Sequence, residues 1–358
     1  LDGNANDETG SYNGTASNIT YSDPAEFPLI QYNGTPTNVN FLGMAFQPDL
    51  VWVKRRDSGI GTTRHLIFDS IRGAGKRISS ESSDQEYTVT TEVTSFDSNG
   101  FTLGNNGSIN GSGGSLVAWC WKGGGTAVSN TNGSITSQVS ANQDAGFSIV
   151  KYTGNSTAGA TIGHGLGTPP DLIILKLLDA TKDWYVFSEL LGQSGGEYQY
   201  LVLNTTDAAT TFNTQQVWNG DLPTSDLFTL TGGSADNTNN NDYIAYCFNS
   251  VAGFSKIGSY TGNGSTNGPT ITTGFRPLFI MIKGASVADN WSIWDNVRDT
   301  GDNIDQILVP NNTGTESPDG FGRYDITLSN TGFQIKRTDG QINASGGTYI
   351  YMAFANQF

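Results

Sequence analysis

Short runs of apolar and aromatic residues alternate with turns rich in Gly, Asn, Thr and Ser along the whole chain. The longest runs, LIILKLL at 172–178 and PLFIMI at 277–282, are far shorter than the ~20 residues that a membrane-spanning helix needs. Short strands that end in Asn-Gly turns are typical of antiparallel sheets. The pattern therefore predicts an all-β protein that does not insert into a membrane.

The same order of predicted strands occurs three times along the chain. One motif recurs as PDLVWVKRRD at 48–57, as PDLIILKLLD at 170–179 and, more divergent, as RPLFIMIKGASVAD at 276–289. A tyrosine-containing strand with an Asn/Gly turn precedes each copy. An aromatic strand, a strand preceded by glycine and a closing strand such as YIAYCF at 243–248 follow it. The repeat is too long for a solenoid, so each copy is expected to bury its own core.

The repeat predicts three tandem antiparallel β-sandwich modules with a jelly-roll-like topology, arranged as beads in series. The closing strands are apolar on both faces, so each is either central in its sandwich or covered on its second face by a neighbouring module. The predicted divisions are an N-terminal segment at 1–26, module 1 at 27–125, a linker at 126–145, module 2 at 146–250 and module 3 at 251–358.

The charge of the chain argues against one class of partner. Asp and Glu outnumber Lys and Arg by 33 to 18, which gives a formal net charge of -15 over 358 residues. A groove for DNA or RNA needs the opposite sign, so no nucleic-acid partner is expected. Because the chain begins with Leu1 rather than Met, we also expect it to be a portion of a longer protein.

The sequence does not point to an enzyme. The serine of GQSGG at 192–196 fits a nucleophile elbow, but such a hydrolase needs a later histidine, and His65 and His164 both precede it. Paired acids for glycoside cleavage stay an open alternative, because a sandwich can bring distant carboxylates to the required ~5–9 Å. Cys120 and Cys247 occupy the same position in two copies, so two small buried side chains are expected in preference to a bridge or a reactive thiol.

Tryptophans on the aromatic strands are candidate ligand contacts. Trp184, Trp291 and Trp294 lie on this strand in the second and third copies, where exposed indoles would stack on sugar rings. Packing in the core is the alternative for tryptophans on a strand. His65 begins the strand in the first copy, so a repeated ligand site would be incomplete there.

Three oxygen-rich segments are candidate calcium sites: DGNANDE at 2–8, DNTNNND at 236–242 and DTGDNID at 299–305. The candidate ligands are Asp2, Asn4, Asn6, Asp236 and Asp242. No segment has the complete twelve-residue loop with Gly at the sixth place and Glu at the twelfth, and a solvated Asn/Asp turn is the alternative. Calcium is therefore an optional ligand, and no other cofactor is expected.

Two parts of the sequence resemble known families. The opening LDGNANDETGSYNGTA, at 1–16, resembles the first strand and turn of concanavalin-like, laminin-G-type jelly rolls, without the rest of that domain. The repeat itself, with YTGN, a GF-x-PDL-x-x-x-K phrase and the closing YIAYCF, resembles a module of tail-fibre and other virion proteins of tailed bacteriophages, especially those of marine bacteria. This resemblance covers 27–358 and implies a virion setting with no catalytic residues. The first copy departs from the phrase with AFQPDL, and the third has Leu278 in place of Asp.

These observations predict a structural protein that is not an enzyme. We expect a tail fibre or similar appendage of a phage particle, located in the virion and assembled as a homo-oligomer, with a trimer favoured. Its expected partners are other virion proteins and host-surface glycans, which many weak contacts would hold by avidity. The alternatives are a capsid decoration or head-fibre protein, and a secreted bacterial carbohydrate-binding adhesin module.

Overall fold

The structure is a computed structural model that describes residues 20–21, 29–35, 37–58, 63–212, 217–316 and 325–355. Almost all of its elements are β strands, and every strand pairing within the named sheets is antiparallel. Helix is limited in this part of the chain to α1 (Gly107–Asn110) and two 3-10 turns, η1 (Glu189–Leu191) and η2 (Val217–Gly220). The prediction of an all-β protein is confirmed. None of the described helices is long and apolar enough to cross a membrane.

The first group of strands forms two facing sheets, which we call unit 1. Its strands are β1 (Thr20–Tyr21), β2 (Leu29–Asn33), β3 (Val39–Leu42), β4 (Leu50–Arg55), β5 (His65–Asp69), β6 (Lys76–Ser79), β7 (Tyr87–Thr88), β8 (Val93–Asp97), β9 (Gly100–Leu103) and β10 (Ser115–Trp121). The larger sheet has the order β1-β2-β10-β4-β5-β6-β7, and the smaller has the order β3-β9-β8. Phe41, Val53 and Phe101 belong to the core between the two sheets.

The second group, unit 2, has the same plan. Its strands are β11 (Val128–Asn130), β12 (Ser137–Asn142), β13 (Phe147–Thr153), β14 (Thr161–Gly163), β15 (Leu172–Leu177), β16 (Tyr185–Phe187), β17 (Gln193–Ser194), β18 (Glu197–Tyr198), β19 (Tyr200–Val202), β20 (Leu227–Thr229) and β21 (Asp242–Phe248). The large sheet has the order β11-β12-β13-β21-β15-β16-β19, and β14-β20 and β17-β18 are two-stranded sheets. Tyr152, Leu175 and Phe228 belong to its core.

The third group, unit 3, is built from two four-stranded sheets. Its strands are β22 (Ser255–Thr261), β23 (Thr270–Thr272), β24 (Pro277–Gly284), β25 (Ser292–Asp295), β26 (Asn303–Ile304), β27 (Ile326–Ser329), β28 (Gly332–Ile335) and β29 (Thr348–Ala355). The sheet orders are β22-β29-β24-β25 and β23-β28-β27-β26. Ile280, Tyr351 and Phe333 belong to the core between them.

The three large sheets share one order of strands, which is β2-β10-β4-β5 in unit 1, β13-β21-β15-β16 in unit 2 and β22-β29-β24-β25 in unit 3. In each sheet the closing strand, β10, β21 or β29, pairs on one side with the first strand and on the other side with the strand that carries the repeated motif. A closing strand is therefore central in its sheet, as one of the two explanations of its apolar faces requires.

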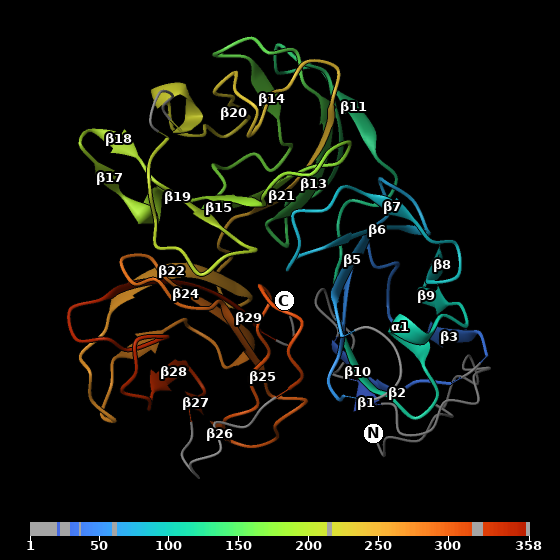
Figure 1. Cartoon of the computed structure of the whole chain (residues 1–358), viewed down its shortest axis with the longest axis vertical. Helices are drawn as coiled ribbons and strands as arrows, with labels where there is room; N and C mark the ends of the chain where they lie inside the picture. The colour runs from blue at the N-terminus through green and yellow to red at the C-terminus, as the bar shows by residue number, and fades with distance from the viewer. Residues whose placement is uncertain are drawn as a thin grey trace.

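The second explanation holds as well, because the large sheets cover one another. Alternate residues of each closing strand face different cores: Ala245 lies in the core of unit 2, whereas Tyr246 lies in a separate cluster. That cluster, which we call the shared core, contains residues of all three units. Figure 1 shows the units arranged around this common centre. The expectation of beads in series is wrong, because each sheet has a second apolar face that water would otherwise contact.

Three aromatic rings at equivalent positions meet in the middle of the shared core. Trp121, Phe248 and Phe354 stand at or next to the ends of the three closing strands. The ring centroids are 6.4 Å apart for Trp121 and Phe248, 5.9 Å for Trp121 and Phe354, and 6.1 Å for Phe248 and Phe354. This triangle places the three units around a pseudo-threefold axis within one chain.

Replacing Phe354 by Ala tests whether the units depend on each other. We expect the free energy of unfolding to fall by about 3–5 kcal/mol, as for other buried Phe to Ala changes, because a cavity opens in the shared core. All three units should still unfold in one transition, since each loses a covered sheet face when any other unfolds. Urea denaturation followed by both tryptophan fluorescence and circular dichroism measures this.

Tyr87 to Ala is the matched control, because this ring is 42% exposed on an edge strand and should change stability by no more than about 0.5 kcal/mol. Separate transitions in the native chain, or a Phe354 variant in which two units keep their native midpoint, would contradict the dependence.

Candidate functional site

Two of the tryptophans that the sequence singles out lie between units. Trp184 and Trp291 are 0% and 1% exposed. The Trp184 Nε1 donates to the backbone oxygen of Ser79 in unit 1 at 2.9 Å, and the Trp291 Nε1 donates to that of Val202 in unit 2 at 3.0 Å. Each indole therefore fastens its own unit to the preceding one.

Trp294 is the third candidate, and it is also fully buried. Its Nε1 donates to Oδ2 of Asp325 at 3.0 Å within unit 3. The prediction that these tryptophans stack on sugar rings is wrong, because none of the three has a ring face in contact with solvent. Packing in the interior, the alternative that the sequence left open, is their role.

The two candidate calcium ligands that the structure describes are not brought together in one site. Asp236 is buried and accepts hydrogen bonds from the backbone N and the Oγ1 of Thr231, both at 2.7 Å, and burial raises its pKa to about 6. Asp242 pairs with Lys151 at 2.7 Å and accepts from Thr153 at 2.7 Å. Among the described residues no group of three His, Cys, Asp or Glu could hold a metal ion. The remaining candidates, Asp2, Asn4 and Asn6, lie outside the described residues.

Both cysteines are buried thiols, as expected. Cys120 lies in the core of unit 1 and Cys247 in that of unit 2, and neither forms a disulfide. Burial raises the pKa of both thiols, which keeps them protonated and unreactive.

The lysine of the repeated motif makes a contact between units. Lys176 on β15 is fully buried, and its Nζ donates to the backbone oxygen of Ser83 in unit 1 at 3.0 Å. Lys283 on β24 is equally buried and donates to the backbone oxygen of Thr206 in unit 2 at 3.2 Å. The same lysine of the motif therefore holds the same part of the preceding unit in two places.

Lys54 on β4 is the third motif lysine, and its Nζ donates to the backbone oxygen of Thr63. Loss of hydration on burial lowers the pKa of all three lysines to about 8, and nearby carboxylates such as that of Glu81 oppose the shift. Backbone carbonyl dipoles supply the hydrogen bonds that a buried ammonium group requires.

The contacts of each unit with the next lie on a segment that also repeats. We call these the docking segments, and they read ISSESSDQE at 78–86, LVLNTTDAA at 201–209 and LVPNNTGTE at 308–316. The last residue of each donates its backbone N–H to the second residue after the motif lysine of another unit: Glu86 to Leu178 (2.9 Å), Ala209 to Ala285 (2.7 Å) and Glu316 to Arg56 (2.8 Å). We call the three contacts seam 1–2, seam 2–3 and seam 3–1.

The docking segments were not predicted from the repeat, although the sequence carries a signal for them. The fourth residue of each docking segment accepts a hydrogen bond from a backbone N–H of its own unit. The donor is the first ring-bearing residue of the aromatic strand. These bonds run from Trp184 to Asn204 (2.8 Å), from Trp291 to Asn311 (2.9 Å) and from His65 to Glu81 (3.1 Å). An acceptor at the fourth place followed by Ser, Thr or Asn is the pattern that the three copies share.

Seam 1–2 contains a buried ion pair with an aromatic donor. Asp69 and Arg72 of unit 1 lie 2.5 Å apart with side chains that are 0% and 1% exposed. The hydroxyl of Tyr246, from unit 2, donates to Asp69 at 2.7 Å. Arg72 also pairs with Glu86 at 3.3 Å, so the pair is linked to the docking segment.

Seam 3–1 has the same arrangement, with an ion pair that also joins the two units. Asp295 and Arg298 of unit 3 lie 2.5 Å apart, and the Trp119 indole of unit 1 donates to Asp295 at 3.1 Å. Glu316 accepts from Arg298 at 2.6 Å and from Arg56 of unit 1 at 2.6 Å. The pair of Glu316 and Arg56 therefore crosses from one unit to the other.

Seam 2–3 has apolar or neutral side chains at these positions. Ser188 and Leu191 of unit 2 stand where the other units have Asp and Arg, and Met352 of unit 3 stands where they have Tyr or Trp. Leu191 and Met352 are both part of the shared core. A hydrophobic contact and a buried ion pair thus hold equivalent seams, in line with the small net energy of buried salt bridges.

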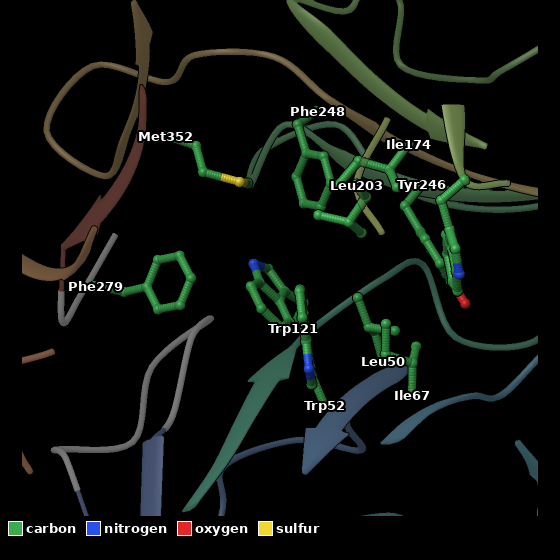
Figure 2. A pocket seen from close by; sticks show the side chains of 11 residues that line it. Leu50, Trp52, Ile67, Trp121, Ile174, Leu203, Tyr246, Phe248, Phe279 and Met352 are labelled. Atoms are coloured by element: carbon green, nitrogen blue, oxygen red, sulfur yellow. The ribbon is translucent and has the colours of Figure 1, made fainter. Parts of the chain in front are cut away.

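The shared core encloses one small apolar cavity. It measures about 20 Å³ and is lined by residues of all three units, among them Trp121, Tyr246 and Phe279. Figure 2 shows the Trp121 ring pointing into the space between Phe248, Phe279 and Met352. Ligand pockets measure ~300–1,000 Å³, so this space is a gap in the packing and no binding site. The contacts described above hold the three units against one another.

Removing one motif lysine should change how stability depends on pH. Each of the three keeps a pKa of about 8 in the folded chain, against roughly 10.4 when unfolded. Between these values the unfolded chain binds more protons, so stability rises with pH, by at most about 1.4 kcal/mol per pH unit for each lysine. Lys176 to Met should remove about a third of the contribution that the three lysines make to this rise between pH 8 and pH 9.

Urea midpoints at the two pH values measure the effect. Lys256 to Met, at an exposed position on β22, is the control and should leave the slope unchanged. From about pH 8 upward the buried Cys120 and Cys247 act in the opposite direction, because thiols of the unfolded chain lose their protons at pH ~8.5 while burial keeps them on the folded chain. A Lys176 variant with the native slope would contradict the assignment.

Seam 3–1 should tolerate the loss of its ion pair only when both partners are replaced together. Arg298 to Leu leaves Asp295 buried without its partner and should destabilise the protein by about 3–5 kcal/mol. A triple variant reproduces the side chains of seam 2–3 by combining Trp119 to Met, Asp295 to Ser and Arg298 to Leu. It should regain most of the stability that the single variant loses. Denaturation midpoints compare the two. A triple variant less stable than the single one would refute the equivalence of the seams.

Comparison with known proteins identifies a family and no named relative. No curated protein and no solved structure matches the chain. Residues 23–357 match a family model described as a domain of unknown function, DUF7483, and this match extends over units 1, 2 and 3. Since the match covers far more than half of the chain, the protein belongs to the DUF7483 family.

Proposed function

We propose that this chain is a structural protein of a tailed-bacteriophage particle, a tail fibre or another appendage that projects from the virion. The observation that carries the proposal is the shared core, around which three units are closed into one body. Residues of the repeated motifs join one unit to the next through hydrogen bonds. Lys176, Trp184 and Lys283 are examples. The setting comes from the resemblance of the repeat to phage virion proteins.

The mechanism that we propose is presentation by a rigid support. Three units fixed around one axis carry their outer loops at equivalent places, so a weak contact made by one unit is available to the others. Such contacts multiply by avidity when their geometry permits simultaneous binding. The partners in this proposal are other virion proteins, further copies of the chain in a trimer, and host-surface glycans.

A non-enzymatic role is part of the proposal. Buried ionisable groups often mark active sites, because burial shifts their pKa values. Here Lys176, Asp69 and Lys283 are engaged in contacts between units, which is a structural use of such groups. Calcium binding at the first residues of the chain stays a prediction.

A capsid decoration or head-fibre protein is the second candidate, and the closed arrangement of the units favours it. Three units around an axis form a compact three-lobed body, as seen in Figure 1, whereas a fibre needs units stacked along its length. Closed point-group symmetry is also the usual arrangement of protein assemblies, so a pseudo-threefold body fits a threefold position on a particle.

Immunogold labelling of purified phage particles, imaged by negative stain, tests the proposal. An antibody against this chain should label the tail or its fibres if the first candidate is right, and the head surface if the second is right. Particles without the gene and uninfected host cells are the controls. Labelling of uninfected cells alone would contradict both virion candidates and favour an adhesin.

A further inference from the structure

Seam 3–1 differs from the other seams in its connection. Units 1 and 2 follow one another along the chain, as do units 2 and 3, so seams 1–2 and 2–3 each lie between units that one linker joins. Units 3 and 1 stand at opposite ends of the described chain, and noncovalent contacts close the circle between them. This seam can therefore open without separating consecutive units.

A histidine occupies the key position of seam 3–1. His65 stands where units 2 and 3 have Trp184 and Trp291, and it is 0% exposed. Its Nδ1 lies 3.0 Å from the Trp52 Nε1, which has a proton to donate. The Nδ1 must therefore be the unprotonated nitrogen, and the Nε2 carries the ring proton.

The buried ring has no place for a second proton. Protonation at Nδ1 would place the new N–H group against the N–H group of Trp52. One face of the His65 ring is stacked on Trp119, with ring centroids 6.3 Å apart. On the side of unit 3, the backbone of Val309 interacts with His65. A charged imidazole would thus lose one hydrogen bond and stay unsolvated.

The charged groups around His65 also oppose protonation. Burial lowers its pKa well below the usual 6.5, and the cations of Lys54 and Arg298 add to this, against the Val309 backbone interaction. Glu81 accepts from the His65 backbone N–H, but burial raises the Glu81 pKa, so its negative charge is itself disfavoured. Asp295, from unit 3, is already paired with Arg298 at 2.5 Å.

We propose that seam 3–1 is an acid-operated closure, in which uptake of a proton by His65 separates unit 3 from unit 1 while seams 1–2 and 2–3 stay closed. Opening exposes the imidazole, which then binds a proton with its ordinary affinity. Below pH 6.5 each further pH unit shifts the ratio of closed to open chains about tenfold toward the open form. Above pH 6.5 His65 is neutral in both forms and has no effect.

The other histidine belongs to a different part of the protein. His164 is also buried with a lowered pKa, but it lies in a turn of unit 2, where its Nε2 is 3.1 Å from the Thr224 oxygen and its Nδ1 accepts from the Leu166 N–H at 3.3 Å. Its protonation would destabilise the interior of unit 2 and leave the contacts between units unchanged. The two histidines can therefore be told apart by where the chain opens.

Hydrogen exchange of three equivalent backbone amides in the native chain tests the closure. Glu316 donates across seam 3–1, Glu86 across seam 1–2 and Ala209 across seam 2–3. From pH 7.5 to pH 5.0, after correction for the intrinsic pH dependence of exchange, protection of Glu316 should fall by up to about thirtyfold. The protection of the Glu86 and Ala209 amides from exchange should not change. Equal losses at all three amides, or unchanged protection of Glu316, would overturn the proposal.

A variant that copies seam 1–2 provides the matched control. Ile174 and Trp184 of unit 2 stand where unit 1 has Trp52 and His65, so Trp52→Ile with His65→Trp supplies an indole donor and the space for it. The acid response of Glu316 should vanish in this variant and persist in His164→Asn. An unchanged response in the first variant, or its loss in the second, would exclude His65 as the trigger. If the double variant does not fold, His65→Phe serves the same comparison.

Discussion

The structure depends on one constraint, which is that each large sheet is apolar on both faces. A sandwich covers only one of them, so a single unit would leave a wide apolar surface in water. The three units solve this together, because each covers the second face of the others and one core results. The rings of Trp121, Phe248 and Phe354 mark where the three faces meet.

Hydrophobic contact alone does not determine how such sheets dock. Buried donors constrain the docking, because Lys176, Trp184, Lys283 and Trp291 each donate to a backbone oxygen of the preceding unit and would be left without this partner in another orientation. Lys176 and Lys283 reach equivalent oxygens of the preceding units, and the docking segments return a backbone hydrogen bond. The net energy of these polar contacts is small, and their effect is to select one relative orientation.

The three seams show how a repeat can diverge while its architecture is kept. Two seams hold an Asp and Arg pair, and the third holds Leu191 and Met352 in the same place. The seam that closes the circle has gained Glu316 with two arginines and a histidine in place of tryptophan. An ion pair thus crosses the seam where no linker holds the units together.

The sequence by itself determined the all-β class, the order of strands within each copy and the burial of Cys120 and Cys247. Alternation and turn residues encode these features locally. It also indicated that the closing strands are covered on both faces. Only the tertiary structure decided what covers them, and hence that Trp184 and Trp291 are interior residues. The physical reason is that their partners are backbone oxygens of another unit, and every residue has such an oxygen, so no side-chain pattern reveals which one is used.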